Sequence, residues 1–497
     1  MKKLLLLLSV VIAGCGGGGG SGSSNTTPSS ASIAAQGALI APNTSLFSNT
    51  PILLPDLKAK YDTLCGSDVN VQTAIPIDLN NDGKLDLVFD LWCNHKPVGE
   101  YYVGPVPNTL VAFIQTSPGV FQDKTKDIFG SDVVDIGGKN YGYVVTDLNG
   151  DGYDDMIMSC DREDGRTTND YSFSSNMNCQ TVSFISDGRG KYNKVPFGNT
   201  LWGDDIKLIK DKNGNKQIIL LPADSSPEAW TFNGQWNRVS GYEWLQKNPV
   251  FIQSTDSNAP TTIINKYSNG QKLEIWNSLN DVWSKLLDYF YLAPTSILLT
   301  NSSMNTTNTA IFRVDNTDYI DYGGLYEGCA LKRTKDGPTE VLYSFVGGII
   351  QGGYTGQTLT DTWKPPVVKL MSLGVTTQNS NISPVTLNTD QIDSNFYHMT
   401  CMDLNNDGMD DVLIRTTGTP LIYVNNGQGK FGKLNSNIIP KAPKGAAHIY
   451  MDIDGDGISD LLYFPIDRWQ FGSYSKIQFL LYKGNRAIKQ DDLIFAN

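Results

Sequence analysis

DLNNDGKLD at residues 78–86 is one of four versions of an acidic pattern that recurs along the chain. The other three are DLNGDGYDD at 147–155, DLNNDGMDD at 403–411 and DIDGDGISD at 452–460, and we number them as the first to fourth loop. Every copy has oxygen-bearing side chains at positions 1, 3, 5 and 9 and glycine at position 6. Glycine accepts the tight turn that other residues would strain. This spacing predicts an oxygen-lined loop that can surround one cation.

The oxygen atoms of this pattern match the requirements of Ca²⁺, which takes about six to eight oxygen ligands at about 2.3–2.6 Å. Alternate residues of a tight turn point their carboxylates inward, and position 7 contributes a backbone carbonyl. The carboxylates repel one another when no cation is present, so we expect the loop to tighten on binding. The expected ligands are Asp78, Asn80, Asp82, Lys84 and Asp86; Asp147, Asn149, Asp151, Tyr153 and Asp155; Asp403, Asn405, Asp407, Met409 and Asp411; and Asp452, Asp454, Asp456, Ile458 and Asp460.

The residues beside each loop distinguish it from an EF-hand, which has a helix on both sides and a Glu at position 12. Short apolar runs follow position 9 instead, such as residues 87–89 and 412–414. Runs this short, rich in β-branched and aromatic residues, predict strands. We therefore expect each loop to be the turn of a β-hairpin held by metal. A single copy could be an Asx turn that binds nothing, whereas four copies favour Ca²⁺ over Mg²⁺ or Mn²⁺.

These loops resemble the FG-GAP or VCBS repeats, which build the β-propeller of integrin α-subunits and of many bacterial surface proteins. A second marker of that family is a strand that ends in a glycine and asparagine turn before an aromatic residue. Residues 423–431 match this marker closely, and residues 184–192 match it well. The resemblance implies that the metal loops are structural, lie away from the usual partner surface and do not encode ligand preference.

The spacing of the loops agrees with a propeller, in which one sheet forms each blade. The first two loops begin 69 residues apart and the last two 49 residues apart, which are blade-sized intervals. Units near residues 75, 145, 205, 260, 305, 400 and 450 predict an all-β propeller of seven blades, with six or eight as alternatives. Residues 346–395 fit the repeat poorly and are expected to form an insertion. Insertions often carry the specific surface, so Trp363 is the candidate ligand-binding residue.

The N-terminus predicts export and a lipid anchor. A basic start, an apolar stretch at residues 4–12 and a small-residue cleavage site before Cys15 resemble a bacterial lipoprotein signal. We expect residues 1–14 to be removed, Cys15 to be lipidated, residues 15–40 to form a Gly/Ser-rich tether and residues 41–497 to form the propeller. Gly16 stands where an inner-membrane retention signal would have Asp, which implies the outer membrane, on its periplasmic side or at the cell surface. A plain secretory signal is the alternative.

Six cysteines remain after Cys15, an even number that suits disulfides in an exported protein. About fifteen connectivities are possible for six cysteines, and the sequence does not choose among them. Pairing of neighbours along the chain joins Cys65 with Cys93, Cys160 with Cys179, and Cys329 with Cys401. Buried free thiols are the alternative.

The remaining observations concern function. The net charge is −12, with 39 Lys and Arg against 51 Asp and Glu, and the acidity gathers in the loops, which argues against nucleic acid as a partner. No GxSxG, HExxH or phosphate-binding glycine motif is present, and His398 and His448 precede metal loops as core positions would.

We therefore predict no catalytic residue and no enzymatic activity. The predicted function is that of a lipid-anchored calcium-binding propeller, integrin-like in its repeats, that binds a protein or a glycan in cell adhesion at the envelope. We expect the lipid anchor to be its only attachment to the membrane. A Ca²⁺-dependent polysaccharide lyase and a scaffold of an outer-membrane assembly are the alternatives.

Overall fold

The chain divides into two units, residues 1–43 and residues 44–497, and the computed structural model describes part of the second. The described residues are 45–57, 60, 69–93, 96–98, 101–103, 109–134, 136, 142–159, 181–197, 205–210, 215–221, 226–242, 245, 250–252, 262–266, 273–279, 282–289, 297–301, 306–314, 317–335, 339–350, 363–373, 384–386, 396–416, 418–428, 430–443, 446–465 and 479–495. Cys15 and the predicted signal and tether lie outside them. No helix in this part of the chain is long and apolar enough to cross a membrane.

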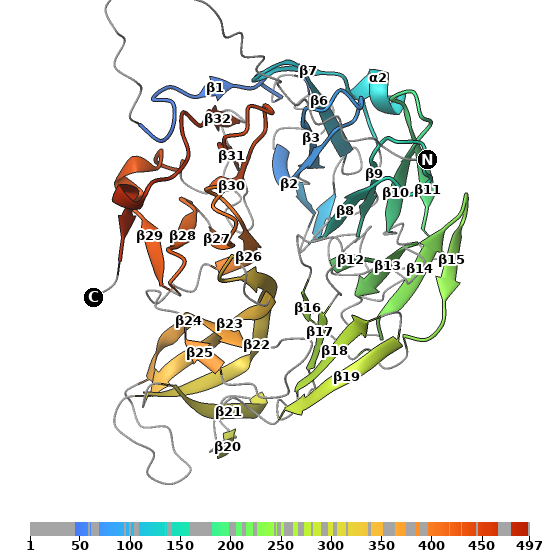
Figure 1. Ribbon diagram of the computed structural model, residues 1–497. Coiled ribbons are helices and arrows are strands. Elements are labelled where there is room, and N and C mark those ends of the chain that lie inside the picture. The colour runs from blue at the N-terminus through green and yellow to red at the C-terminus, as the bar shows by residue number, and fades with distance from the viewer. Residues whose placement is uncertain are drawn as a thin grey trace, which may run out of the picture. The chain divides into compact units, whose positions relative to one another are not determined.

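Antiparallel sheets follow one another along the chain, as the colours of Figure 1 show. Four regular sheets come first. They are β2 (Val69–Ile77), β3 (Asp86–Cys93), β6 (Thr109–Ser117) and β7 (Val120–Asp123); β8 (Tyr143–Thr146), β9 (Asp155–Met158), β10 (Val182–Ser186) and β11 (Tyr192–Pro196); β12 (Asp205–Lys210), β13 (Lys216–Leu221), β14 (Glu228–Phe232) and β15 (Trp236–Val239); and β16 (Val250–Ile252), β17 (Thr262–Lys266), β18 (Leu273–Leu279) and β19 (Val282–Tyr289).

Three further sheets complete the series. A six-stranded sheet holds β20 (Ile297–Asn301), β21 (Thr306–Val314), β22 (Thr317–Lys332), β23 (Thr339–Ile350), β24 (Trp363–Leu373) and β25 (Pro384–Thr386). A five-stranded sheet holds β26 (Phe396–Met402), β27 (Asp411–Thr416), β28 (Leu421–Asn425), β29 (Phe431–Leu434) and β33 (Leu493–Ile494). The last sheet holds β30 (Ala446–Met451), β31 (Asp460–Pro465), β32 (Leu480–Tyr482) and β1 (Ile52–Leu53). A small ribbon of β4 (Lys96–Val98) and β5 (Tyr101–Val103), the helix α2 (Thr125–Phe129) and the 3₁₀ turns η2 (Ser436–Ile438) and η3 (Gln490–Asp492) are additions.

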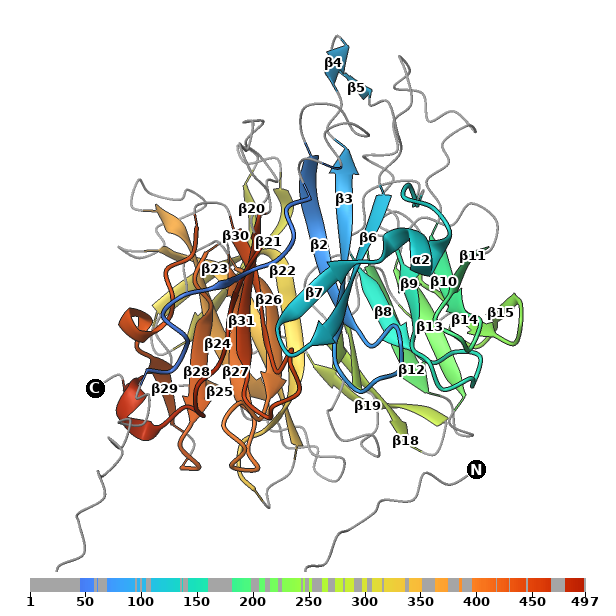
Figure 2. The same cartoon turned by 90° about the horizontal axis from the view of Figure 1, so that it is seen from above.

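The central strands are apolar on both faces because each sheet is covered on both sides. In β3, which lies between β2 and β6 in Figure 2, Leu87, Val88 and Phe89 are all fully buried. Successive side chains of a strand point to opposite faces. Phe89 accordingly packs in a cluster with the last sheet, where its ring lies 4.2 Å from that of Phe479, and Val88 packs in a cluster with Met156 of the second sheet. Burial on both faces explains why these strands read as continuous apolar runs.

The packing of successive sheets is that of an all-β β-propeller. Apolar clusters join the first sheet to the second, the second to the third, and the five-stranded sheet to the sheets on either side of it. The cluster around Phe89 then joins the first sheet to the last. The predicted fold class is therefore confirmed.

The predicted number of blades is wrong. Among the described residues, five sheets have the four antiparallel strands of a regular blade, where the sequence led us to expect seven blades. The sheets of six and five strands depart from the regular size. In the six-stranded sheet, β22 is a strand of 16 residues that pairs with β21 near its start and with β23 along most of its length, so the sheet extends beyond four strands. Part of the expected insertion at 346–395 forms the end of β23, β24 and β25 in this sheet.

A disulfide ties two neighbouring sheets together. Cys329 of β22 and Cys401 of β26 are bonded, with their Cα atoms 5.6 Å apart. This pair confirms one of the three predicted disulfides. For the other two, Cys65, Cys160 and Cys179 lie outside the described residues, so those pairings stay predictions.

Candidate metal centre

Each acidic loop joins two paired neighbouring strands of one sheet. The first loop lies between β2 and β3, the second between β8 and β9, the third between β26 and β27, and the fourth between β30 and β31. Glycine at position 6 has a positive φ in every copy, from 85° at Gly83 to 91° at Gly152. Position 4 also has a positive φ, 55° at Asn81, 62° at Asn406 and 79° at both Gly150 and Gly455. Asn and Gly are the residues that tolerate this conformation. Their presence at position 4 of every loop is a further sign of the turn in the sequence.

The carboxylate at position 1 gathers the backbone N–H groups of the turn. Asp78 accepts hydrogen bonds from the N–H groups of Asp82 and Gly83, at 3.1 and 2.9 Å. The first residue of the fourth loop, Asp452, accepts three such bonds, at 2.8–3.1 Å. The loop therefore curls around its first carboxylate.

Positions 5 and 7 are connected in the same way in every loop. The N–H group of the position 7 residue donates to the position 5 carboxylate at 2.8–2.9 Å. These pairs are Lys84 and Asp82, Tyr153 and Asp151, Met409 and Asp407, and Ile458 and Asp456. Position 3 supplies an acceptor too: Asn80, Asn149 and Asn405 accept from the N–H of position 5 in their loops. The predicted ligands of each loop thus lie on one short turn in one repeated arrangement.

Position 9 has a role that the sequence did not reveal. Its carboxylate is fully buried in all four copies and accepts at least two backbone N–H groups, one at loop position 2 and one close to the end of the third strand of the sheet. Asp86 accepts from Leu79 and Gln115 (2.9 and 2.7 Å), Asp155 from Leu148 and Ser186 (2.6 and 2.7 Å), Asp411 from Leu404 and Asn425 (2.9 and 2.8 Å), and Asp460 from Ile453 and Gly484 (3.1 and 2.8 Å). This carboxylate therefore clamps the loop to a third strand, in addition to any metal that it binds.

Burial changes the acidity of these four carboxyl groups. Loss of contact with water raises the pKa of Asp86 and Asp411 to about 7 and that of Asp155 and Asp460 to about 6. Nearby carboxylates of the same loop act in the same direction. The backbone N–H groups that each one accepts act in the opposite direction. A cation beside these groups would favour their ionised form, so the electrostatics of the loops suit a positively charged ligand.

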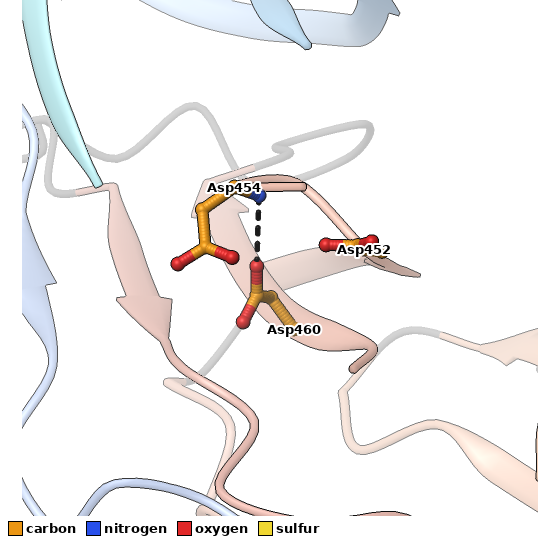
Figure 3. A group of neighbouring side chains, drawn as sticks. All are labelled: Asp452, Asp454 and Asp460. Carbon is orange, nitrogen blue, oxygen red and sulfur yellow. Dashed lines mark hydrogen bonds between the residues drawn. The ribbon is translucent and has the colours of Figure 1, made fainter. Parts of the chain in front are cut away.

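The fourth loop brings three carboxylates together, as Figure 3 shows. Asp452, Asp454 and Asp460 each offer an oxygen, and these oxygens all lie within 4.8 Å of one another. Two oxygens on opposite sides of a bound Ca²⁺ are about 4.6–5.2 Å apart, so the spacing fits one calcium ion. The other three loops have Asn in place of the position 3 carboxylate. Of all the loops, the fourth therefore offers the most negative charge close to one point.

Trp363 and His448, which the sequence also singled out, lie in strands and not in the loops. Trp363 begins β24 and is in register with Ile350 of β23. His448 is fully buried, and its Nδ1 atom is 3.0 Å from the carbonyl oxygen of Gly418. Burial, with the nearby charge of Arg415, lowers its pKa to about 3. His448 is thus a neutral core residue, as the sequence led us to expect.

Comparison with known proteins finds one repeat in this chain and several distantly similar structures. Residues 403–463, which hold the third and fourth loops, match the family model described as FG-GAP-like repeat. No curated protein matches the chain significantly. Similar solved structures include the V. cholerae biofilm matrix protein Bap1, at 13% identity over 86% of this chain and 88% of that one, with a TM-score of 0.36. An Agrocybe aegerita lectin for non-reducing terminal N-acetylglucosamine has 14% identity over 74% and 79% of the two chains, with a TM-score of 0.35.

A third similar structure concerns catalysis. The Bacillus licheniformis rhamnogalacturonan lyase PL11 has 13% identity over 90% of this chain and 76% of that one, with a TM-score of 0.38. With TM-scores no higher than 0.38, these likenesses assign no activity to this chain. The prediction that the chain is not an enzyme is nevertheless corrected, because the similar structures include polysaccharide lyases. The fold gives no ground to exclude catalysis.

Proposed function

From the FG-GAP-like repeat in this β-propeller, we propose that the chain is a calcium-binding propeller in which each of the four acidic loops binds one Ca²⁺. The observation that carries the proposal is the fourth loop, where oxygens of Asp452, Asp454 and Asp460 converge at a spacing that suits one calcium ion. The repeated hydrogen bonds in the other three loops support the same use of their oxygens. Mg²⁺ fits less well, because it prefers fewer protein ligands and keeps several waters.

The bound ions act on stability in this proposal. A cation offsets the mutual repulsion of the carboxylates in each loop, and each loop is tied through position 9 to the third strand of its sheet. Binding therefore stabilises the hairpin and its sheet together. A ligand that binds only the folded state raises stability by about 2.7 kcal/mol when its concentration is about 100 times its dissociation constant.

Isothermal titration of the chelated protein with CaCl₂ tests this proposal. We expect four calcium ions per chain and a rise in melting temperature on binding. Asp456→Ala removes a position 5 carboxylate and should reduce the number of ions to three. Asp491→Ala removes an exposed carboxylate of η3 and is the matched control, with four ions retained. Absence of calcium binding in the wild type would refute the proposal.

We further propose that a lipid at Cys15 anchors this propeller to the bacterial outer membrane, where it binds a protein or a glycan. The support is the signal-like N-terminus, with a cysteine at the expected cleavage point and a Gly/Ser-rich stretch after it. The full chain, extracted in detergent, would be tested on a glycan array and by identification of co-purifying envelope proteins, each with and without Ca²⁺. Release of unsaturated products from acidic polysaccharides would identify a lyase instead. A Cys15→Ser variant that remains in the membrane fraction would contradict the anchor.

A further inference from the structure

The fourth loop has a positive charge of its own beside it. The ammonium of Lys483, which follows β32, forms ion pairs with Asp454 and Asp456, the latter at 3.9 Å. The Asp454 side chain is fully buried, whereas that of Lys483 is one-third exposed. The ion pair with Asp454 raises the pKa of Lys483, so the lysine is charged at neutral pH. A protein cation therefore lies beside two of the four carboxylates that we propose as Ca²⁺ ligands, Asp454 and Asp456.

The backbone around Lys483 holds the start of the described chain. We call residues 45–54 the N-terminal clasp, because they run antiparallel to residues 479–485. The N–H of Ser48 donates to the carbonyl of Lys483 at 2.8 Å, and the N–H of Lys483 donates to Oγ of Ser48 at 3.1 Å. The N–H of Asn485 donates to the carbonyl of Leu46 at 3.0 Å. The clasp supplies β1, the outermost strand of the last sheet.

Gly484, which lies between Lys483 and Asn485, contacts the fourth loop. The N–H of Gly484 donates to the position 9 carboxylate of Asp460 at 2.8 Å. A Cβ at Gly484 would lie only 2.4 Å from the carbonyl oxygen of Ser459 and 2.6 Å from the side chain of Ile458. Only glycine fits such a close approach. Residues 483–485 therefore contact the fourth loop on one side and the clasp on the other.

Resting on the calcium sites proposed above, we propose that the Lys483 ammonium replaces Ca²⁺ in the fourth loop when the ion leaves and thereby keeps the N-terminal clasp in place. Two consequences follow. Ca²⁺ has to displace this ammonium, so the fourth loop binds Ca²⁺ more weakly than its three converging carboxylates alone would. At low calcium, the ion pair of Lys483 with Asp454 still holds residues 483–485 against the fourth loop. The clasp therefore stays paired with the last sheet whether or not calcium is bound.

The third loop shows what the same surroundings look like without an ion pair. Lys335 passes close to Gly408 of that loop, with side-chain atoms 3.5–3.7 Å from the position of a Cβ there. Among the described residues, Lys335 forms no salt bridge to a loop carboxylate.

The clasp also forms one wall of a cavity of about 450 Å³, lined in addition by residues 437–441, Tyr482 and Arg486. Loosening of the clasp would open this cavity.

The test compares Lys483→Met with Lys483→Arg, which keeps the charge, and with Lys335→Met as the matched control. Calcium titration of Lys483→Met should show one of the four sites binding about fivefold to tenfold more tightly, because the competing ion pairs are removed. The gain should vanish in the Asp456→Ala background, which assigns it to the fourth loop. Lys483→Arg and Lys335→Met should leave all four affinities close to wild type.

Hydrogen exchange of the full chain tests the clasp directly. In EDTA, the amides of Ser48 and Asn485 should stay protected in the wild type and exchange at least about tenfold faster in Lys483→Met, with protection restored by Ca²⁺. Four wild-type calcium sites with unchanged affinity and unchanged exchange in Lys483→Met would overturn this inference and leave the proposed function standing. Absence of calcium binding in the wild type would overturn both.

Discussion

Replacement of Asp411 by alanine should destabilise the metal-free protein far more than replacement of another carboxylate in the same loop. The Asp411 side chain is fully buried and accepts two backbone N–H groups, from Leu404 at 2.9 Å and from Asn425 at 2.8 Å. Alanine leaves both donors buried without this acceptor, and each such loss amounts to about 1–3 kcal/mol. We therefore expect Asp411→Ala to lower the free energy of unfolding by about 3–5 kcal/mol.

Asp407→Ala is the internal control for this prediction. Asp407 lies in the same loop, is partly exposed, and accepts a hydrogen bond from the N–H of Met409 at 2.9 Å. Its loss should lower the free energy of unfolding by about 1 kcal/mol or less without metal. Both variants should lose the same calcium site, so the difference between them in stability reports the hydrogen bonds of Asp411 and not the metal.

Urea unfolding in EDTA at pH 5 and at pH 8 measures the difference. Burial raises the pKa of Asp411 to about 7, so its ionised form disfavours folding at pH 8, and the loss of stability in Asp411→Ala should be larger at pH 5. Asp411→Asn keeps one acceptor oxygen and should fall between the two variants. Equal destabilisation of Asp411→Ala and Asp407→Ala in EDTA would refute the clamp and reduce position 9 to a metal ligand.

Two more outcomes follow from groups away from the loops. The pKa of His448 is about 3 in the folded protein and about 6.5 in the unfolded chain, so the unfolded chain takes up the proton first as the pH falls. The contribution of His448 to the free energy of unfolding is complete above pH 7, and about 2 kcal/mol of it is lost by pH 5. Urea unfolding of His448→Gln at both pH values should lack this loss, and a pH dependence equal to that of the wild type would contradict the prediction. Reduction of the bond between Cys329 and Cys401, which closes 72 residues of sequence, should lower the free energy of unfolding by about 4 kcal/mol, measured by urea unfolding with and without reductant. A change below about 1 kcal/mol would contradict this value.

The hairpins were predictable because their signals are local. Oxygen ligands at alternate positions, Gly83 at position 6 and the apolar run after Asp86 all lie within a dozen residues. They predicted a turn between two strands, and the structure shows one at each loop. The bond between Cys329 and Cys401 was predicted from their order along the chain, and it joins neighbouring sheets because successive sheets are neighbours in a propeller.

The remaining features depend on contacts that the local pattern does not contain. The clamp formed by Asp86 needs the N–H of Gln115, and no pattern in the loop indicates which strand supplies it. The predicted number of blades failed because residues 297–386 form a sheet of six strands and the sheet of residues 396–434 gains β33 from the end of the chain, which leaves five sheets of the regular size among the described residues. No local pattern indicates either addition. The clasp joins residues near 50 to residues near 481 through a strand of two residues, which is too short to show a periodic pattern.

Calcium titration followed by thermal unfolding shows whether metal holds the four loops. After chelation, the wild-type chain should bind four calcium ions, and saturating Ca²⁺ should raise its melting temperature, with Mg²⁺ at the same concentration giving a much smaller rise. A chain that binds no calcium and melts at the same temperature in EDTA and in Ca²⁺ would show that the four acidic loops are hydrogen-bonded turns and that metal has no part in the fold.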